Sequence, residues 1–136
     1  MRELSWRAMM REYAAPYVVA GSLPHEDAAA GLGQDRRGLL RRLVSALPLS
    51  GDYALAEIIE RDGTYIQCAL SLAGDAAEVA DAVGAVASAD RSRHWRFRFD
   101  EAAASAIEAA LGRDVPSETP LQATAAQRGG SRPRLA

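Results

Sequence analysis

The side chains that could carry acid–base chemistry are few in this chain and lie far apart in its sequence. The 136 residues include two histidines, His25 and His94. An imidazole beside a partly buried carboxylate can act as a general acid or base near neutral pH. Glu57, Glu60 and Asp62 are the carboxylates that could serve, although each also suits the edge or the turn of a strand. His25, His94 and Glu57 therefore form the candidate catalytic set.

Neither a nucleophilic cysteine nor a metal site is expected. Cys68, the single cysteine, falls on the apolar face of a predicted strand, where a thiol is most often a small buried hydrophobic group. One cysteine allows no disulfide within the chain and fits a reducing compartment, so we expect a cytoplasmic location. His25, Glu26 and Asp27 are adjacent, and adjacent donors cannot easily all face one ion. We therefore expect no metal and no cofactor.

Segment 91–98 is the most suggestive of a ligand, because its basic and aromatic residues alternate. A strand here places the two kinds of side chain on opposite faces. The aromatic set is Trp95, Phe97 and Phe99, and the basic set is His94, Arg96 and Arg98. Sheets that bind single-stranded RNA need their aromatic rings on the open face, whereas this alternation turns the rings toward the core. Binding of single-stranded nucleic acid is therefore disfavoured and ranks third among the candidate functions.

Other side chains are suited to contact with a protein. We expect Tyr65, Gln67, Arg96 and Arg98 to lie on the face of a sheet that helices leave open, and to share it with Glu57. Arg and Tyr are enriched in interfaces, and guanidinium groups pair well with carboxylates of a partner. The alternative is cross-strand pairing within the chain, which contributes about 1 kcal/mol or less at an exposed site.

A second candidate surface lies near the N-terminus. Trp6, Met9, Met10 and Tyr13 recur three and four residues apart within segment 3–15, which is typical of one face of a helix. This apolar stripe either completes the core or docks a partner. Trp6 and Tyr13 are therefore added to the candidate partner-binding residues.

Hydrophobic periodicity predicts the elements that hold these residues. Helices are expected over 3–15, 35–47, 75–87 and 101–111, and strands over 17–20, 53–60, 64–72 and 94–99. Asp35, Asp75 and Asp100 are the predicted N-caps, with Asp75 and Glu78 forming a capping box. Val79, Val83 and Val86 are expected to mark the buried stripe of the third helix. Arg61, Asp62 and Gly63 separate two β-rich runs, which predicts a hairpin.

If the weak strand at 17–20 forms, the central elements read βαββαβ, the split arrangement of the ferredoxin-like architecture. We therefore predict an α+β fold with a small antiparallel sheet, helices packed on one face, and an extra helix at each end. One domain is expected over 1–112. Residues 113–136 are rich in Pro, Gly, Ser, Thr and Gln, so we expect a disordered tail.

Composition narrows the functional classes further. A chain that is 49% hydrophobic and 25% charged is typical of a soluble globular domain. The net charge of −2 gives no global attraction for a polyanion. No apolar run reaches the roughly 18 residues of a membrane span, and the N-terminus lacks the layout of a secretory signal.

These observations favour a non-catalytic binding or regulatory module that associates with a protein partner or with a second copy of itself. The alternative is a small cofactor-independent enzyme, with its site between the sheet and the 22–34 loop. That alternative requires a pocket that gathers His25, His94 and Glu57.

Overall fold

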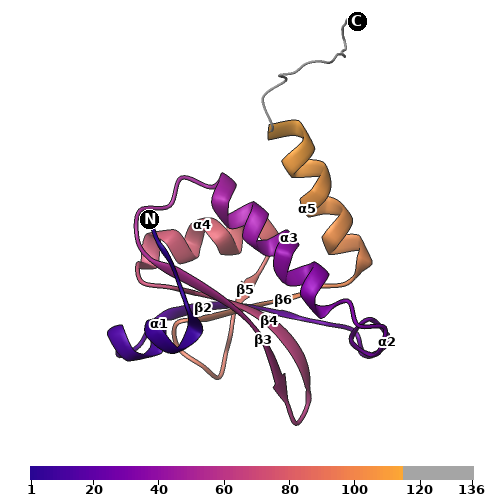
Figure 1. Cartoon of the computed structure of the whole chain (residues 1–136), viewed down its shortest axis with the longest axis horizontal. Coiled ribbons are helices and arrows are strands. Elements are labelled where there is room, and N and C mark those ends of the chain that lie inside the picture. The colour runs from indigo at the N-terminus through magenta and orange to yellow at the C-terminus, as the bar shows by residue number, and fades with distance from the viewer. Residues whose placement is uncertain (115–136) are drawn as a thin grey trace, which may run out of the picture.

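The computed structural model describes residues 1–114, in which five helices and six strands form a mixed α+β structure (Figure 1). The helices are α1 (Trp6–Glu12), α2 (His25–Ala29), α3 (Gly33–Ala46), α4 (Ala73–Val83) and α5 (Glu101–Asp114). The strands are β1 (Glu3–Leu4), β2 (Tyr17–Ser22), β3 (Tyr53–Glu60), β4 (Gly63–Leu70), β5 (Val86–Ala87) and β6 (His94–Arg98). Apart from its first two residues, the predicted tail 113–136 lies outside the described residues.

The strands form one open sheet in the order β1-β3-β4-β2-β6-β5. The expected hairpin of β3 and β4 is present, and β2 pairs antiparallel with β4. The expectation of an antiparallel sheet is wrong, because β1 runs parallel to β3 and β6 runs parallel to β2. The chain leaves β4 through α4, reaches the edge as β5, and turns back as β6. This hairpin reverses β6, so that it runs parallel to β2 and the sheet is not the plain ferredoxin-like arrangement.

Helices pack on both faces of the sheet, whereas the sequence predicted one. The helix-layer face is covered by α3, α4 and α5, and its core includes Ile66, Phe99 and Leu40. The α1 face carries a smaller core in which Met9 of α1 packs with Val18 and other small side chains of the sheet. Strand β4 is consequently buried on both sides from Tyr65 to Leu70.

The N-terminal helix is shorter than predicted, because residues 3 and 4 form an edge strand. Ser5 then caps α1, and its Oγ accepts a hydrogen bond of 3.1 Å from the backbone N–H of Ala8. None of the helices within residues 1–114 is long and apolar enough to cross a membrane.

Two predicted N-caps are wrong, and one is confirmed. α3 begins at Gly33 and α4 at Ala73, both without a side-chain cap. Asp75 is instead buried inside α4, and its carboxylate accepts hydrogen bonds from the backbone N–H groups of Ser50 and Gly51. Asp100 does cap α5, since its Oδ1 accepts a bond of 2.9 Å from the N–H of Ala103.

The third helix also ends earlier than predicted. Gly84 adopts a left-handed conformation, with φ of 70°, and terminates α4 at Val83. Val86 therefore lies in the short edge strand β5, where it is 69% exposed, rather than in a buried stripe.

The alternation predicted for the last strand is confirmed. Phe97 and Phe99 are buried in the helix-layer core and Trp95 packs against it, while Arg96 and Arg98 are exposed. Gly21 of β2 leaves the room that these rings occupy, since a Cβ there would lie 2.6 Å from Cζ of Phe97.

Candidate functional site

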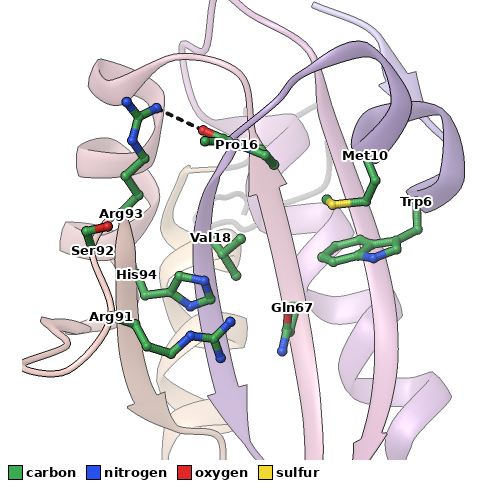
Figure 2. A pocket seen from close by; sticks show the side chains of 10 residues that line it. Trp6, Met10, Pro16, Val18, Gln67, Arg91, Ser92, Arg93 and His94 are labelled. Carbon is green, nitrogen blue, oxygen red and sulfur yellow. Dashed lines mark hydrogen bonds between the residues drawn. The ribbon is translucent and has the colours of Figure 1, made fainter.

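A pocket of about 330 Å³ lies on the α1 face, between α1 and the segment that leads into β6 (Figure 2). Trp6 and Met10 of α1 form one wall. Arg91 and His94 line the opposite wall, and Gln67 of β4 lies between the two walls (Figure 2). The walls thus come from segments about 85 residues apart in the sequence.

A smaller hollow, too narrow to hold a water molecule, adjoins this pocket over β2 and β4. It shares Gln67, Arg91 and His94 with the pocket and extends to Tyr65 and Arg96. We call the pocket and the hollow together the groove. The groove therefore places apolar side chains at one end and cationic side chains at the other.

The floor of the groove is formed by the two most central strands. β2 is paired with β4 and β6, and β4 is paired with β2 and β3. Backbone N–H and C=O groups in central strands are already used in the ladder. Any ligand in the groove must therefore be recognised through side chains, since the floor offers no edge for an added strand.

Arg93 holds the segment that forms the cationic wall. Its φ of 59° is uncommon for a residue with a side chain. Its Nη1 donates a hydrogen bond of 2.9 Å to the backbone oxygen of Ala15, and its guanidinium lies 4.9 Å from the centre of the Tyr17 ring. The backbone oxygen of Arg93 accepts a bond from the N–H of Val18. This arginine is thus engaged in holding the loop against β2.

Arg93 donates a hydrogen bond to the backbone of Ala15, whereas the side chains of Arg91 and Arg96 form neither a hydrogen bond nor an ion pair within residues 1–114. Both are exposed, and the guanidinium of Arg96 lies 5.9 Å from the centre of the Tyr65 ring. Asp90, close to Arg91 in sequence, accepts a hydrogen bond of 2.6 Å from the Ser88 hydroxyl. The groove consequently presents cationic groups that can pair with an incoming anion.

His94 lines the same hollow as these two cations and is half-buried. Burial lowers its pKa below the usual 6.5, and the positive charges of Arg91 and Arg96 lower that pKa further. The nearby carboxylates of Glu60 and Asp90 act in the opposite direction but do not reverse the shift. The imidazole is therefore neutral at pH 7 and offers one donor and one acceptor to the groove.

The structure does not bring the predicted catalytic residues together. His25 is exposed at the start of α2. Glu57 lies on the helix-layer face, where its carboxylate accepts a hydrogen bond of 2.8 Å from Nε2 of Gln34. His94 lies on the α1 face, since it is in register with Val18. The expectation that Glu57 shares a face with Arg96 is therefore wrong.

The predicted partner-binding residues divide into two groups. Trp6, Tyr65, Gln67 and Arg96 line the groove, but the expectation that Tyr65 and Gln67 lie on an open face is wrong, because both are buried. Tyr13 and Arg98 do not: the Tyr13 hydroxyl donates a bond of 2.6 Å to Asp52, and Nε of Arg98 donates one of 3.1 Å to Asp100. Met10, which belongs to the predicted apolar stripe, also lines the pocket. The wall formed by Arg91 was not predicted, because helical periodicity shows which residues share a face of α1 but not what lies beside that face.

The single cysteine lies outside the groove. Cys68 is fully buried in the helix-layer core, and burial raises the pKa of its thiol. No group of three His, Cys, Asp or Glu residues within residues 1–114 is placed to hold a metal ion.

A further hollow of about 430 Å³ lies over α3 and is bounded by Glu108 of α5. Its charges are mixed, because Arg36 and Arg42 are accompanied there by Asp35 and Glu108. Nη2 of Arg36 also lies 3.3 Å from Oε1 of Glu101 and 3.6 Å from Oδ2 of Asp27. These two carboxylates compensate the charge of the buried guanidinium. The groove on the α1 face is thus the better candidate for binding an anion.

Comparisons of the chain with protein families, with the sequences of curated proteins and with solved structures find no match.

Proposed function

We propose that the chain is a non-catalytic binding module that associates with another protein through the groove on its α1 face. The observation that carries this proposal is the adjacency of Trp6 and Met10 to Arg91 and Arg96, which form no ion pair within residues 1–114. Aromatic residues, Met and Arg are the residue types enriched in protein interfaces. An apolar group beside an available cation suits an anchor with a charged rim.

The placement of the histidines supports a binding role over catalysis. General acid–base chemistry needs its groups within hydrogen-bond reach of one substrate. His94 and Glu57 are separated by the sheet, and His25 lies on α2 at the opposite layer from the groove. Of the carboxylates considered as partners for His94, Glu60 lines the same hollow, but its charge does not reverse the lowering of the His94 pKa. A polar group in a binding surface is the role that these surroundings support.

Site-specific photo-crosslinking in the source cells tests the proposal. A benzophenone amino acid replaces Met10 at the groove, and in a control it replaces Ala106, an exposed residue of α5. We expect a discrete protein adduct from position 10 and none from position 106. An adduct of twice the chain mass would identify a second copy of the chain as the partner. This result would also support the proposal.

Three results would overturn the proposal. The first is an adduct from position 10 that nuclease removes, which would assign the groove to nucleic acid. The second is no adduct at position 10, and the third is the same adducts from both positions, in each case while the two substituted chains remain folded by circular dichroism.

A further inference from the structure

We infer that the groove recognises a short acidic segment of a partner protein that carries an apolar side chain beside a carboxylate. This inference deepens the proposed function and rests on the groove being the interface. It assigns one chemical feature of the ligand to each end of the groove.

The apolar feature follows from the pocket end. Trp6 is half-buried, Met10 is 39% exposed, and Val18 beneath them is 5% exposed. A pocket of about 330 Å³ is at the small end of the range of roughly 300–1,000 Å³ typical of ligand sites. It can therefore take one aromatic or large aliphatic side chain, whose burial would also remove water from the indole and the thioether.

The anionic feature follows from the other end. The guanidinium groups of Arg91 and Arg96 stand on either side of His94 in the sequence and line the same hollow. A guanidinium can bind a carboxylate through two parallel hydrogen bonds. Glu60 is the one carboxylate among the residues that line this hollow, and Asp90, which is hydrogen-bonded to Ser88, also lies near the two arginines. An acidic ligand thus complements the charge of the groove.

A protein segment fits the groove better than a nucleic acid does. Phe97 of β6 is buried in the helix-layer core and Trp95 packs against that core, so these rings cannot stack on bases in the groove.

The occupant must come from another chain. Residues 115–136 hold three arginines and one glutamate, so this part of the chain has the wrong charge for a cationic groove. A partner with an acidic segment has the right one. Because the floor strands are already paired on both sides, the segment cannot bind by adding a strand to them.

Titration of the full-length, ¹⁵N-labelled protein with blocked hexapeptides tests the inference by NMR. The probe places a central Phe-Glu pair among four glycines. One matched peptide carries Phe-Gln, and another carries Gly-Glu. We expect saturable shifts of the Trp6 indole N–H and of the Arg96 amide, with affinity about fivefold to tenfold weaker for either matched peptide. The indole of Trp95, on the opposite face, is the internal control and should not move.

Variants separate the groove from general electrostatics. Arg91→Gln and Arg96→Gln should each weaken the Phe-Glu peptide about threefold to tenfold. Arg42→Gln removes the same charge from α3 and should leave the affinity unchanged. Raising the salt from about 0.05 M to about 0.3 M should also weaken binding several-fold.

Three outcomes would overturn the inference: no saturable shift with Phe-Glu at millimolar concentration, equal affinity for Phe-Glu and Phe-Gln, or tighter binding of a short oligothymidylate. A protein adduct in the crosslinking experiment combined with any of these would preserve the proposed function and reject only its acidic ligand. Loss of that adduct would reject both.

Discussion

Gly21 is a position where one missing side chain decides the packing of a strand. A Cβ at this residue would lie 2.6 Å from Phe97 and 2.9 Å from Phe99, both of them buried rings. We expect Gly21→Ala to lower the free energy of unfolding by about 1–3 kcal/mol, because the rings cannot move aside without strain.

Gly38 provides the matched control in urea denaturation. It lies within α3, and no atom lies within 4 Å of a Cβ built there. Gly38→Ala should raise the free energy of unfolding by about 0.5–1 kcal/mol, since alanine has the higher helix propensity. Equal effects of the two substitutions would contradict the packing described for Gly21.

His94 gives the molecule a specific dependence on pH. Its folded-state pKa is lowered by burial and by Arg91 and Arg96, against the opposing charges of Glu60 and Asp90. A depressed histidine pKa means that the unfolded chain binds a proton more readily than the folded one. The contribution of His94 to the free energy of unfolding is therefore complete above about pH 6.5, the pKa of histidine in the unfolded chain. That contribution is lost as the pH falls from there through the lower pKa of His94 in the folded protein.

We accordingly expect the urea midpoint to fall between pH 7.5 and pH 5.5 by more in the native chain than in His94→Gln. Glutamine keeps a donor and an acceptor but does not titrate. An identical fall in both proteins would show that His94 does not contribute to the pH dependence.

At the scale of elements, Asp75 shows why a local motif can mislead. The spacing of Asp75 and Glu78 predicted a capping box, yet α4 begins two residues before Asp75. Its carboxylate instead receives N–H donors from Ser50 and Gly51, 24 or 25 residues away. A capping motif indicates that an aspartate can accept hydrogen bonds from backbone N–H groups. Those N–H groups can belong to a distant loop instead of the first turn of a helix.

This interpretation predicts unequal effects of two substitutions within α4. Asp75→Ala should reduce the free energy of unfolding by about 2–3 kcal/mol, because it leaves part-buried N–H groups without an acceptor. Glu78 is exposed, and Glu78→Ala should change stability by less than about 0.5 kcal/mol. Chemical denaturation of both variants decides the matter, and a larger effect at Glu78 would favour the capping box.

Docking of α1 depends on one of two adjacent methionines. Met9 is 0% exposed in the smaller core, whereas Met10 is 39% exposed at the pocket. Met9→Ala should cost about 2–5 kcal/mol of stability. Met10→Ala should leave stability within about 0.5 kcal/mol of the native value while weakening the peptide probe. If both variants unfold at the native urea midpoint, α1 does not pack as described.

At the scale of the whole molecule, the two cores share the same central strands. Ile66 and Cys68 face the helix-layer core, and Tyr65 and Ala69 of the same strand face α1. Because β4 contributes to both cores, neither can be lost without exposing the other side of that strand. We expect the structure to unfold in one cooperative step.

The two tryptophans allow this to be measured, since Trp6 packs on one core and Trp95 on the other. Trp95→Phe leaves Trp6 as the reporter, and Trp6→Phe leaves Trp95. In each variant the fluorescence and far-ultraviolet circular dichroism transitions in urea should coincide. An earlier Trp6 transition would mean that α1 detaches before the sheet unfolds.

Much of the fold could be predicted from the sequence, but little of the site. The alternation at 94–99 and the 53–72 hairpin follow from side-chain periodicity, which local residues determine. The groove depends on α1 lying beside segment 91–94, and periodicity does not specify which distant segments become neighbours. The same limit explains why parallel pairing of β6 with β2 was not predicted: the hairpin with β5 reverses β6, and a two-residue strand is too short to have a pattern.

The late position of β6 has a consequence for synthesis of the chain. Its pairing with β2 joins residues 17–22 to residues 94–98, so the sheet cannot be completed until nearly all of the described chain has left the ribosome. Trp6 and Met10 emerge early, without the wall that faces them in the finished protein. If the proposed groove is the interface, a nascent chain lacks the complete binding surface until β6 has paired with β2.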